Sequence, residues 1–276
     1  MEEMRYAPVG VFDSGVGGLT VAREILRQIP NERIVYFGDT ARVPYGSKSK
    51  DTILRFSRQI VNFLKTKQVK AVVVACNTAS ALALEELAPE VDLPIIGVVI
   101  PGARVAAAST RNKKVGVIAT ESTIESGLYT RVIHGFAPDV EVYGKACPLF
   151  VPLVEEGWLD DPVTVEVAKR YLDPLLATGI DTLVMGCTHY PLLRGMLREV
   201  LGSGVTLVNP AYETALELKD LLAREGLEND GAHASEDTEN PHRYYVSDAA
   251  GKFCEFANTI LPFDVDTAKL INIEDY

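Results

Sequence analysis

The stretch "KAVVVACNTAS" (70–80) joins an apolar run directly to polar side chains, and this design indicates the fold. Its run of small apolar residues predicts a strand that is covered on both faces, as in a parallel sheet. Cys76 ends this run and is followed at once by two hydrogen-bonding side chains, Asn77 and Thr78. Ligands of open α/β sheets bind at the carboxyl ends of the strands, so this strand end is a candidate site.

A second stretch, "DTLVMGCTHYP" (181–191), has the same design. An apolar run ends in Cys187, and Thr188 and His189 follow it. A lone cysteine near an apolar strand is usually a small core residue. Two cysteines that occupy the same place in two similar stretches indicate a shared function instead.

Short β-rich runs alternate with helical patterns along the chain. The predicted strands lie at 9–12, 34–37, 71–75, 95–99, 115–118, 140–143, 182–185 and 206–208. Between them, apolar residues recur on one helical face over 18–29 and 51–64. Strands that are separated by helices indicate an α/β fold with parallel sheets.

The chain also repeats itself. The segment "VGVFD" (9–13) resembles "VGVIA" (115–119), and 70–78 resembles 181–189 at a similar separation. We therefore predict two similar doubly wound parallel-sheet domains that face each other across a cleft. In that arrangement the two cysteines reach the cleft from opposite sides.

The composition is that of a soluble globular protein, with 47% hydrophobic and 24% charged residues in a chain of 276, which is long enough for two domains. A net charge of -11 argues against a broad surface for nucleic acid or an anionic membrane. The first residues lack the pattern of a secretory signal, and no apolar run reaches the length of a membrane span, so we expect a cytoplasmic protein. Segment 225–242 lacks apolar periodicity and is predicted to be a mobile surface loop.

The four cysteines, Cys76, Cys147, Cys187 and Cys254, lie far apart without a C-x-x-C pair, which favours reduced thiols. Cys147 and Cys254 are interpreted as core residues. A metal site could combine Cys76, Cys187 and His189, but the sequence offers no clear fourth ligand, so we expect no metal. A hydrolase with one cysteine nucleophile and His189 as its base would leave the other thiol without a role.

The stretch "FDSGVGGLT" (12–20) follows a strand and opens a helix, as a dinucleotide-binding loop does. The order G-x-G-x-x-G requires a glycine where Thr20 stands, although Asp39 has the spacing of a ribose-binding acid. Thr20 therefore weighs against a nicotinamide-dependent oxidoreductase. Asp13 and Ser14, at the tip of the strand, are better explained as side chains that point into a cleft.

Two thiols on opposite sides of one small ligand suit the inversion of a carbon centre. One takes a proton from one face of the carbon, and the other returns a proton to the opposite face. Enantiomers have equal free energy in achiral solvent, so the enzyme needs two groups of like kind, one thiolate and one thiol, that exchange roles. An ordinary cysteine has a pKa of about 8.5, which hydrogen-bond donors or a helix N-terminus can lower.

Three further side chains are candidates to assist the proton transfer. Asp13 is expected near Cys76, and His189 with Glu155 near the second cysteine. Glu156 stands beside Glu155 and could serve as well.

In order and over nearly the whole chain, a set of motifs resembles the glutamate racemases of the aspartate/glutamate racemase family. The motifs are "FDSGVGGLTV", "YFGDTARVPYG", "ACNTASA", "CPLFVPLVEEG" and "GCTHYPLL". The combination of "DSGVGG", "CNTAS" and "GCTHYP" is highly specific, whereas any one of them alone would be weak. In an aspartate racemase the second cysteine motif resembles G-C-T-E, so His189 favours glutamate over this alternative.

The resemblance implies interconversion of L- and D-glutamate without a cofactor, in support of bacterial peptidoglycan synthesis. It implies that Cys76 works on the D-enantiomer and Cys187 on the L-enantiomer. It also implies a discontinuous first domain, 1–98 plus 210–276, that carries Cys76, and a second domain, 99–209, that carries Cys187. Dimers are common in the family, so the resemblance is compatible with a homodimer.

Site residues follow from the same resemblance. The catalytic set is Cys76, Cys187, Asp13, His189 and Glu155, and the substrate is expected to meet Asp13, Ser14, Tyr45, Gly46, Asn77, Thr78, Thr120, Thr123 and Thr188. Tyr45 and Gly46 are expected at the side-chain carboxylate of glutamate, and the others at its α-carboxylate and ammonium groups. Hydroxyls, amides and backbone N–H groups can fix an anion with little need for arginine. From another class, a two-lobed amino-acid-binding protein without chemistry is the alternative.

Overall fold

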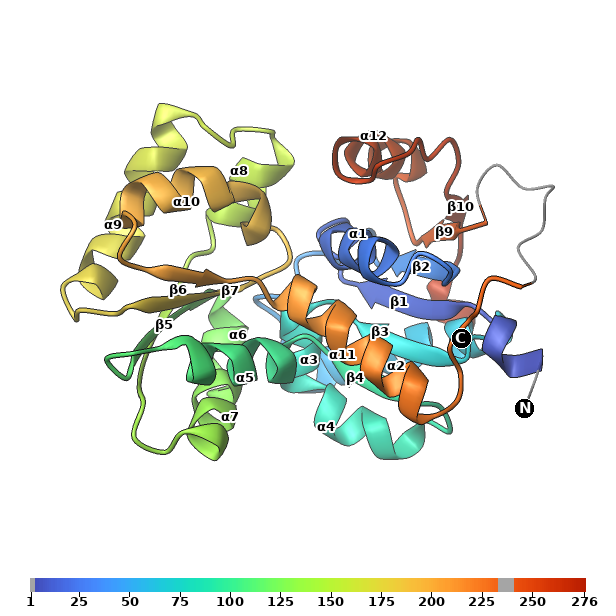
Figure 1. Cartoon of the computed structure of the whole chain (residues 1–276). Coiled ribbons are helices and arrows are strands. Elements are labelled where there is room, and N and C mark those ends of the chain that lie inside the picture. The colour runs from blue at the N-terminus through green and yellow to red at the C-terminus, as the bar shows by residue number, and fades with distance from the viewer. Residues whose placement is uncertain (1–2, 233–240) are drawn as a thin grey trace.

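The computed structural model describes residues 3–232 and 241–276 of the chain. Within these residues, ten strands form a six-stranded and a four-stranded sheet, and every pair of neighbouring strands is parallel. Figure 1 shows the two sheets side by side, with helices covering the faces of each. The predicted α/β fold class with two parallel sheets is confirmed.

The first sheet contains both the beginning and the end of the described chain. Its strands, in spatial order, are β10 (Lys269–Leu270), β9 (Arg243–Val246), β2 (Ile34–Gly38), β1 (Val9–Asp13), β3 (Ala71–Val74) and β4 (Ile95–Gly97). The helices on one face are α1 (Leu19–Gln28), α11 (Pro210–Arg224) and α12 (Ala250–Ile260), and those on the other are α2 (Lys50–Thr66), α3 (Asn77–Leu82) and α4 (Leu84–Leu87). Val9 and Val11 of β1 pack toward the first group of helices, whereas Phe12 packs toward the second. This alternation follows from the two-residue period of a strand.

The second sheet is built from the middle of the chain. Its strands, in spatial order, are β6 (Glu141–Ala146), β5 (Lys114–Ala119), β7 (Thr182–Gly186) and β8 (Thr206–Val208). The helices on one face are α8 (Phe150–Glu155), α9 (Pro162–Leu176) and α10 (Arg194–Leu201), and those on the other are α5 (Val99–Ser109) and α7 (Leu128–Phe136). The short helix α6 (Glu121–Glu125) follows β5, and four 3-10 helices are η1 (Glu3–Tyr6), η2 (Ala88–Glu90), η3 (Tyr190–Leu193) and η4 (Ile273–Asp275).

The two sheets share one strand order. The sequence β2-β1-β3-β4 in the first sheet corresponds to β6-β5-β7-β8 in the second. Cys76 comes shortly after β3 and Cys187 directly after β7, so both thiols follow the equivalent strand of their sheet. The internal repeat that the sequence indicates is therefore present in the topology.

All eight predicted strands are present, although the bounds of seven differ from the prediction by one to three residues, and two strands were missed. The strand predicted at 95–99 ends at Gly97, because Val99 already begins α5. Strands β9 and β10 were not predicted, and they extend the first sheet beyond β2.

The chain passes from the first sheet to the second through α5 and returns through α11, and these two helices contact each other. The domain boundaries predicted at 98/99 and 209/210 coincide with the starts of the two helices. The division of the chain into two domains at these positions stays a prediction.

Part of the loop predicted at 225–242 lies outside the described residues, namely 233–240. In the described part, the backbone N–H of Asn229 donates to Glu32 at 2.9 Å, and its side-chain amide donates to the Asn31 carbonyl at 2.7 Å. These contacts tie the beginning of the segment to the turn between α1 and β2.

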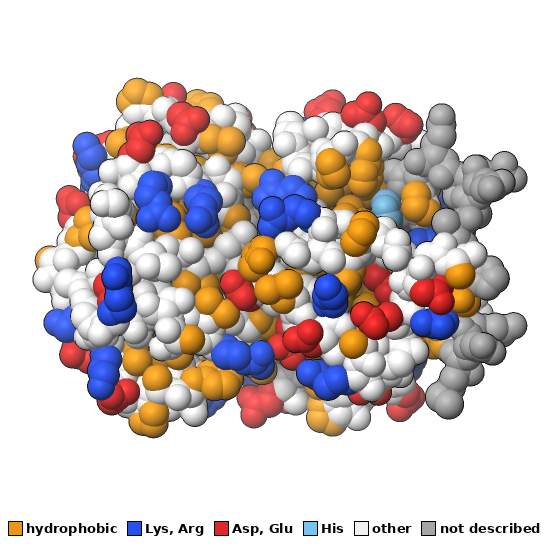
Figure 2. All heavy atoms as spheres, in the orientation of Figure 1, with side chains coloured by type: hydrophobic (Ala, Val, Ile, Leu, Met, Phe, Trp, Pro, Cys, Tyr) orange, Lys and Arg blue, Asp and Glu red, His pale blue; other side chains and the backbone are white. Residues whose placement is uncertain are grey.

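The molecular surface mixes charges of both signs. On the face drawn in Figure 2, acidic and basic side chains of the described residues are interspersed with hydrophobic ones. Among the described residues there is no helix with the length and apolar character needed to cross a membrane.

Candidate active site

A cavity of about 410 Å³ is lined by residues that follow strands of both sheets. Of the residues predicted for the site, those in the lining are Ser14, Tyr45, Gly46, Cys76, Asn77, Thr78, Thr120, Glu155, Cys187, Thr188 and His189. The structure thus brings the two sequence stretches that end in a thiol to one space. Its volume suits a small molecule.

Cys76 occupies the N-cap position of α3, where its sulfur accepts a hydrogen bond from the Ala79 N–H at 3.5 Å. Its thiol donates to the Ser14 hydroxyl at 3.6 Å. Burial and then the nearby charge of Asp13 raise the pKa of Cys76 to about 12, against the opposing effect of these hydrogen bonds. Cys76 is therefore held as a neutral thiol near neutral pH.

Asp13 does not line the cavity but lies fully buried at the end of β1. One carboxylate oxygen accepts from the Gly15 N–H at 2.9 Å, and the other has no hydrogen-bond partner among the described residues. Burial raises the pKa of this carboxyl, against the opposing charge of His189. The charge of this carboxyl in turn raises the pKa of the Cys76 thiol, so the protonation states of the two groups are linked.

Cys187 is the first member of a chain of three side chains. Its sulfur lies 3.9 Å from Nδ1 of His189, and Nε2 of that ring lies 2.9 Å from Oε1 of Glu155. Both Cys187 and His189 are buried, whereas the Glu155 side chain is 47% exposed. The structure thus pairs His189 with Glu155 rather than with its neighbour Glu156.

His189 is the cationic group of the site. Burial alone would lower its pKa, but the hydrogen bonds to Cys187 and Glu155, with the charges of Cys187 and Asp13, outweigh burial and raise the pKa to about 10. The imidazole is therefore protonated near neutral pH. The two thiols consequently differ, one beside a carboxyl and the other beside an imidazolium.

Three threonine hydroxyls form a cluster between the two sheets. Thr120 lies 2.9 Å from both Thr78 and Thr123, and the Thr78 and Thr123 hydroxyls are 3.3 Å apart. Thr78 and Thr120 line the cavity, whereas Thr123, also predicted for the site, is buried behind them. The cluster supplies hydroxyl groups that can donate to an anion.

Asn77 is oriented by a buried tyrosine that was not predicted. The Tyr129 hydroxyl of α7 donates to Oδ1 of Asn77 at 2.7 Å. Because this bond occupies the amide oxygen, the NH₂ group is the part of the side chain that remains to donate to a ligand.

Two glycines allow close approach between loops of the two sheets. A Cβ at Gly17 would lie 2.3 Å from the Thr188 hydroxyl and 2.4 Å from Nδ1 of His189, and a Cβ at Gly46 would lie 2.8 Å from Cβ of Thr120. The Gly46 carbonyl also accepts from the Ser122 hydroxyl at 2.6 Å. Only glycine fits such contacts without movement of the neighbouring loop.

Thr20, which departs from the dinucleotide-binding pattern, also takes part in the contact between the loops of the two sheets. Its hydroxyl lies 2.9 Å from the Thr188 carbonyl and 3.0 Å from the Gly17 carbonyl. The side chain is fully buried. It joins the start of α1 to the segment that follows β7.

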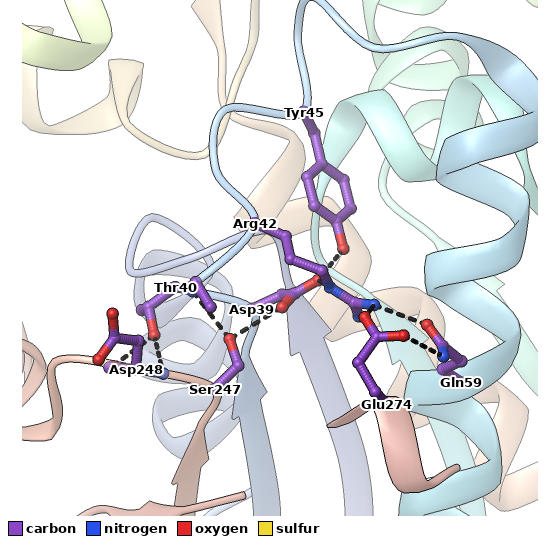
Figure 3. A network of polar contacts seen from close by, with 9 residues as sticks. Asp39, Thr40, Arg42, Tyr45, Gln59, Ser247, Asp248 and Glu274 are labelled. Carbon is purple, nitrogen blue, oxygen red and sulfur yellow. Dashed lines mark hydrogen bonds and ion pairs between the residues drawn. The ribbon is translucent and has the colours of Figure 1, made fainter. Parts of the chain in front are cut away.

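The Tyr45 hydroxyl is not turned to the cavity. It donates to Asp39, and Arg42 and Ser247 also contact this carboxylate, as Figure 3 shows. The part of Tyr45 that lines the cavity is therefore the rest of the residue and not its hydroxyl. The spacing of Asp39 suggested a ribose-binding acid, but here its carboxylate is buried among protein partners.

A largely apolar part of the cavity lining was not predicted from the sequence. These residues are Gly15, Val43, Pro44, Ser47, Glu121, Pro148, Val151 and Pro152. Most stand within the quoted motifs around Tyr45 and Glu155, so the motifs themselves were the available signal. Among the described residues that line the cavity, none is Lys or Arg, and His189 supplies the positive charge.

The sequence predicts that the site holds no metal, and the structure adds one observation to this prediction. Within residues 3–232 and 241–276, no group of three or more His, Cys, Asp or Glu side chains is arranged to hold a metal ion.

Two sheets of parallel strands, each covered by helices, present one thiol each to a single cavity. This fold and this site define an enzyme of the amino-acid racemase class. The family model described as Asp/Glu/Hydantoin racemase matches residues 9–218. The chain belongs to this family.

Individual proteins are similar to the chain over nearly its full length. A glutamate racemase from Geobacter metallireducens is 49% identical over 94% of this chain and 94% of its own. The solved structure of a glutamate racemase from Bacillus anthracis is 39% identical, covers 97% of this chain and 98% of its own, and superposes with a TM-score of 0.90. That of a glutamate racemase from Francisella tularensis, in complex with D-glutamate, is 36% identical over 99% of this chain and 100% of its own, with a TM-score of 0.89.

Proposed function

We propose that this chain interconverts L- and D-glutamate by proton transfer between two thiols, without a cofactor, and supplies D-glutamate for bacterial peptidoglycan. The observation that carries the proposal is that Cys76 and Cys187, which follow equivalent strands of two similar sheets, line one cavity. The relatives named glutamate racemase support glutamate as the substrate. Cytoplasmic location and assembly as a homodimer stay predictions.

In the direction from L- to D-glutamate, Cys187 acts as the base. Its thiolate, 3.9 Å from Nδ1 of His189, takes the α-proton and becomes a thiol. The Cys76 thiol, whose pKa is raised to about 12, gives its proton to the opposite face of the same carbon. The bond to one hydrogen breaks and the bond to another forms, so the product differs from the substrate only in configuration.

In the reverse direction the roles are exchanged. Cys76 must first lose its proton, and the adjacent Asp13 carboxylate is the group placed to accept it. Cys187, protonated by the neighbouring His189 imidazolium, then provides the returning proton, while Glu155 holds the His189 ring. One thiol is thus assisted by a carboxyl and the other by an imidazole, and together they serve both directions of the reaction.

The substrate is held by uncharged donors. The Asn77 NH₂ group, nearby backbone N–H groups and the hydroxyls of Ser14, Thr78, Thr120 and Thr188 are the candidates to donate to the α-carboxylate, and the oxygens of these hydroxyls are the candidates to accept from the ammonium group. Thr123 acts through Thr78 and Thr120. The segment with Tyr45 and Gly46 is the candidate for the side-chain carboxylate, through its backbone.

The test is the decay of circular dichroism in a solution of L-glutamate with the pure protein and no added cofactor. The signal should fall to zero as a racemic mixture forms, while L-aspartate in a parallel sample keeps its signal. Decay with aspartate alone would establish the aspartate alternative, and an unchanged signal with both amino acids would reject the proposal.

The same assay tests the thiols. Cys76→Ala and Cys187→Ala should each lose racemisation in both directions, because each direction needs one thiol as base and the other as acid. Cys254→Ala, on α12 outside the cavity lining, is the matched control and should stay active. More than a few percent of wild-type turnover in either active-site variant would contradict the two-thiol mechanism.

A further inference from the structure

The carboxylate of Asp39 is the centre of a buried network behind one wall of the cavity. Asp39 is 0% exposed, and Arg42 Nε lies 2.7 Å from one of its oxygens, to which the Tyr45 hydroxyl also donates. The Ser247 hydroxyl donates to the other oxygen at 2.9 Å and accepts from the Ala41 N–H at 2.9 Å. Figure 3 shows these side chains converging on Asp39 from β9 and from the segment after β2.

Arg42 connects this network to the end of the chain. Its Nη1 donates to Oε1 of Gln59 on α2 at 2.6 Å and to Oε1 of Glu274 in η4 at 3.0 Å. The Gln59 amide donates to the second Glu274 oxygen at 3.2 Å, which closes a ring of three side chains (Figure 3). The guanidinium also lies 3.9 Å from the centre of the Phe56 ring.

The same segment forms the wall of the cavity. Residues 43–47, directly after Arg42, all line it. The wall is fixed at one side by the bond from the Tyr45 hydroxyl to Asp39, and at the other by the bond from Ser122 to the Gly46 carbonyl. The cavity wall, hereafter 43–47, is thus attached to both sheets.

We propose that Arg42 and Glu274 are positioning residues for the cavity wall 43–47, so that the C-terminal turn η4 controls substrate affinity. Neither side chain lines the cavity. Their action passes through Asp39 and Tyr45, and the Arg42 side chain, 11% exposed, is the link between the buried carboxylate and the 65% exposed Glu274. The inference rests on the proposed racemisation of glutamate, because substrate affinity is what it concerns.

The expected effect is on binding rather than on proton transfer. A displaced wall weakens substrate and transition state alike, which raises KM and leaves kcat nearly unchanged. Both enantiomers meet the same wall, so KM should rise by a similar factor in the two directions. A role in proton transfer would instead lower kcat.

Two variants and a matched control make the test. Arg42→Lys keeps the charge but loses the fork that spans Asp39, Gln59 and Glu274, and should raise KM about tenfold. Glu274→Gln removes only the charge of an exposed partner and should raise KM about two- to fivefold. Asp275→Asn removes the neighbouring charge of the same turn, which contacts Asn272 and not Arg42, and should leave KM unchanged.

KM and kcat are measured for L- and D-glutamate, together with thermal unfolding to verify that each variant is folded. An inactive wild-type protein would reject the proposed function and not this inference. With an active wild type, an unchanged KM in Glu274→Gln and Arg42→Lys, or a fall in kcat at constant KM, would overturn the positioning role. If Arg42→Lys does not fold, the comparison of Glu274→Gln with Asp275→Asn decides.

Discussion

Cys76 and Cys187 occupy equivalent positions, yet their neighbours differ in charge. Cys76 faces the buried Asp13, and burial raises the pKa of both groups. Cys187 faces His189, whose hydrogen bonds raise its pKa to about 10 despite burial. The two thiols therefore differ in their surroundings, with a carboxyl near one and an imidazolium beside the other.

His189 should make stability depend on pH. Its pKa in the folded state, about 10, lies above that of an unfolded histidine, about 6.5. The folded state therefore holds the proton longer, so the stabilisation is complete below about 6.5 and is lost as pH rises toward 10. Thermal unfolding of wild type and His189→Asn between pH 6 and about 10 should show a steeper loss for wild type.

The comparison with His189→Asn removes the contributions of groups that titrate in both proteins, such as Cys76. Parallel curves for the two proteins over this range would contradict a cationic His189 in the folded state.

The start of α1 is the element that joins the two halves of the site. Gly17 lies against Thr188 and His189, and the Thr20 hydroxyl reaches the Thr188 carbonyl at 2.9 Å. This buried bond fixes the segment that carries Cys187 relative to the segment that carries Asp13.

Replacement of Thr20 should affect catalysis more than folding. Thr20→Val keeps the shape but removes the hydroxyl, leaving the buried Thr188 carbonyl without this partner, and should lower kcat about tenfold or more. Thr20→Ser keeps the hydroxyl and should retain most of the rate. Steady-state kinetics and thermal unfolding measure both effects.

A contrary result would be a Thr20→Val variant with wild-type kcat, or a Thr20→Ser variant as slow as Thr20→Val. Either would show that the hydroxyl does not position the second thiol.

The elements were predictable where the apolar signal was strong. Runs such as 71–75 and 182–185 are buried on both faces, and burial of that kind requires the unbroken apolar pattern by which they were found. Strand β10 has only Lys269 and Leu270, both exposed, and so offers no such pattern. Strand β9, "RYYV", is a short aromatic run that pairs with β2 on one side and with the two-residue strand β10 on the other.

The sequence could not show which loops meet in the folded molecule. The motifs predicted that Tyr45 and Thr120 share a site, but not that the Tyr45 hydroxyl turns away to Asp39. That orientation depends on Ser247 and on Glu274, which lie far along the chain and belong to no motif. Contacts between distant segments arise from packing, which periodicity and spacing do not record.

The repeated sheet order explains how one fold serves a symmetric reaction. Each sheet delivers one thiol from the end of the equivalent strand, β3 or β7, so the two faces of a planar carbon can be reached from opposite sides. In the proposed mechanism, the surroundings of each thiol adapt it to one enantiomer. The hydrogen removed and the hydrogen returned are then carried by different sulfur atoms.

The most direct test follows the hydrogen on the α-carbon of glutamate during the reaction in deuterated water. Thiol hydrogens exchange readily with solvent, so Cys76 carries a deuteron before L-glutamate binds. D-glutamate isolated early in the reaction, and analysed by mass spectrometry or proton NMR, should therefore carry deuterium at its α-carbon. A single base that passed the same hydrogen across the plane would give early D-glutamate that is largely unlabelled, and that result would contradict the pairing of Cys76 with Cys187.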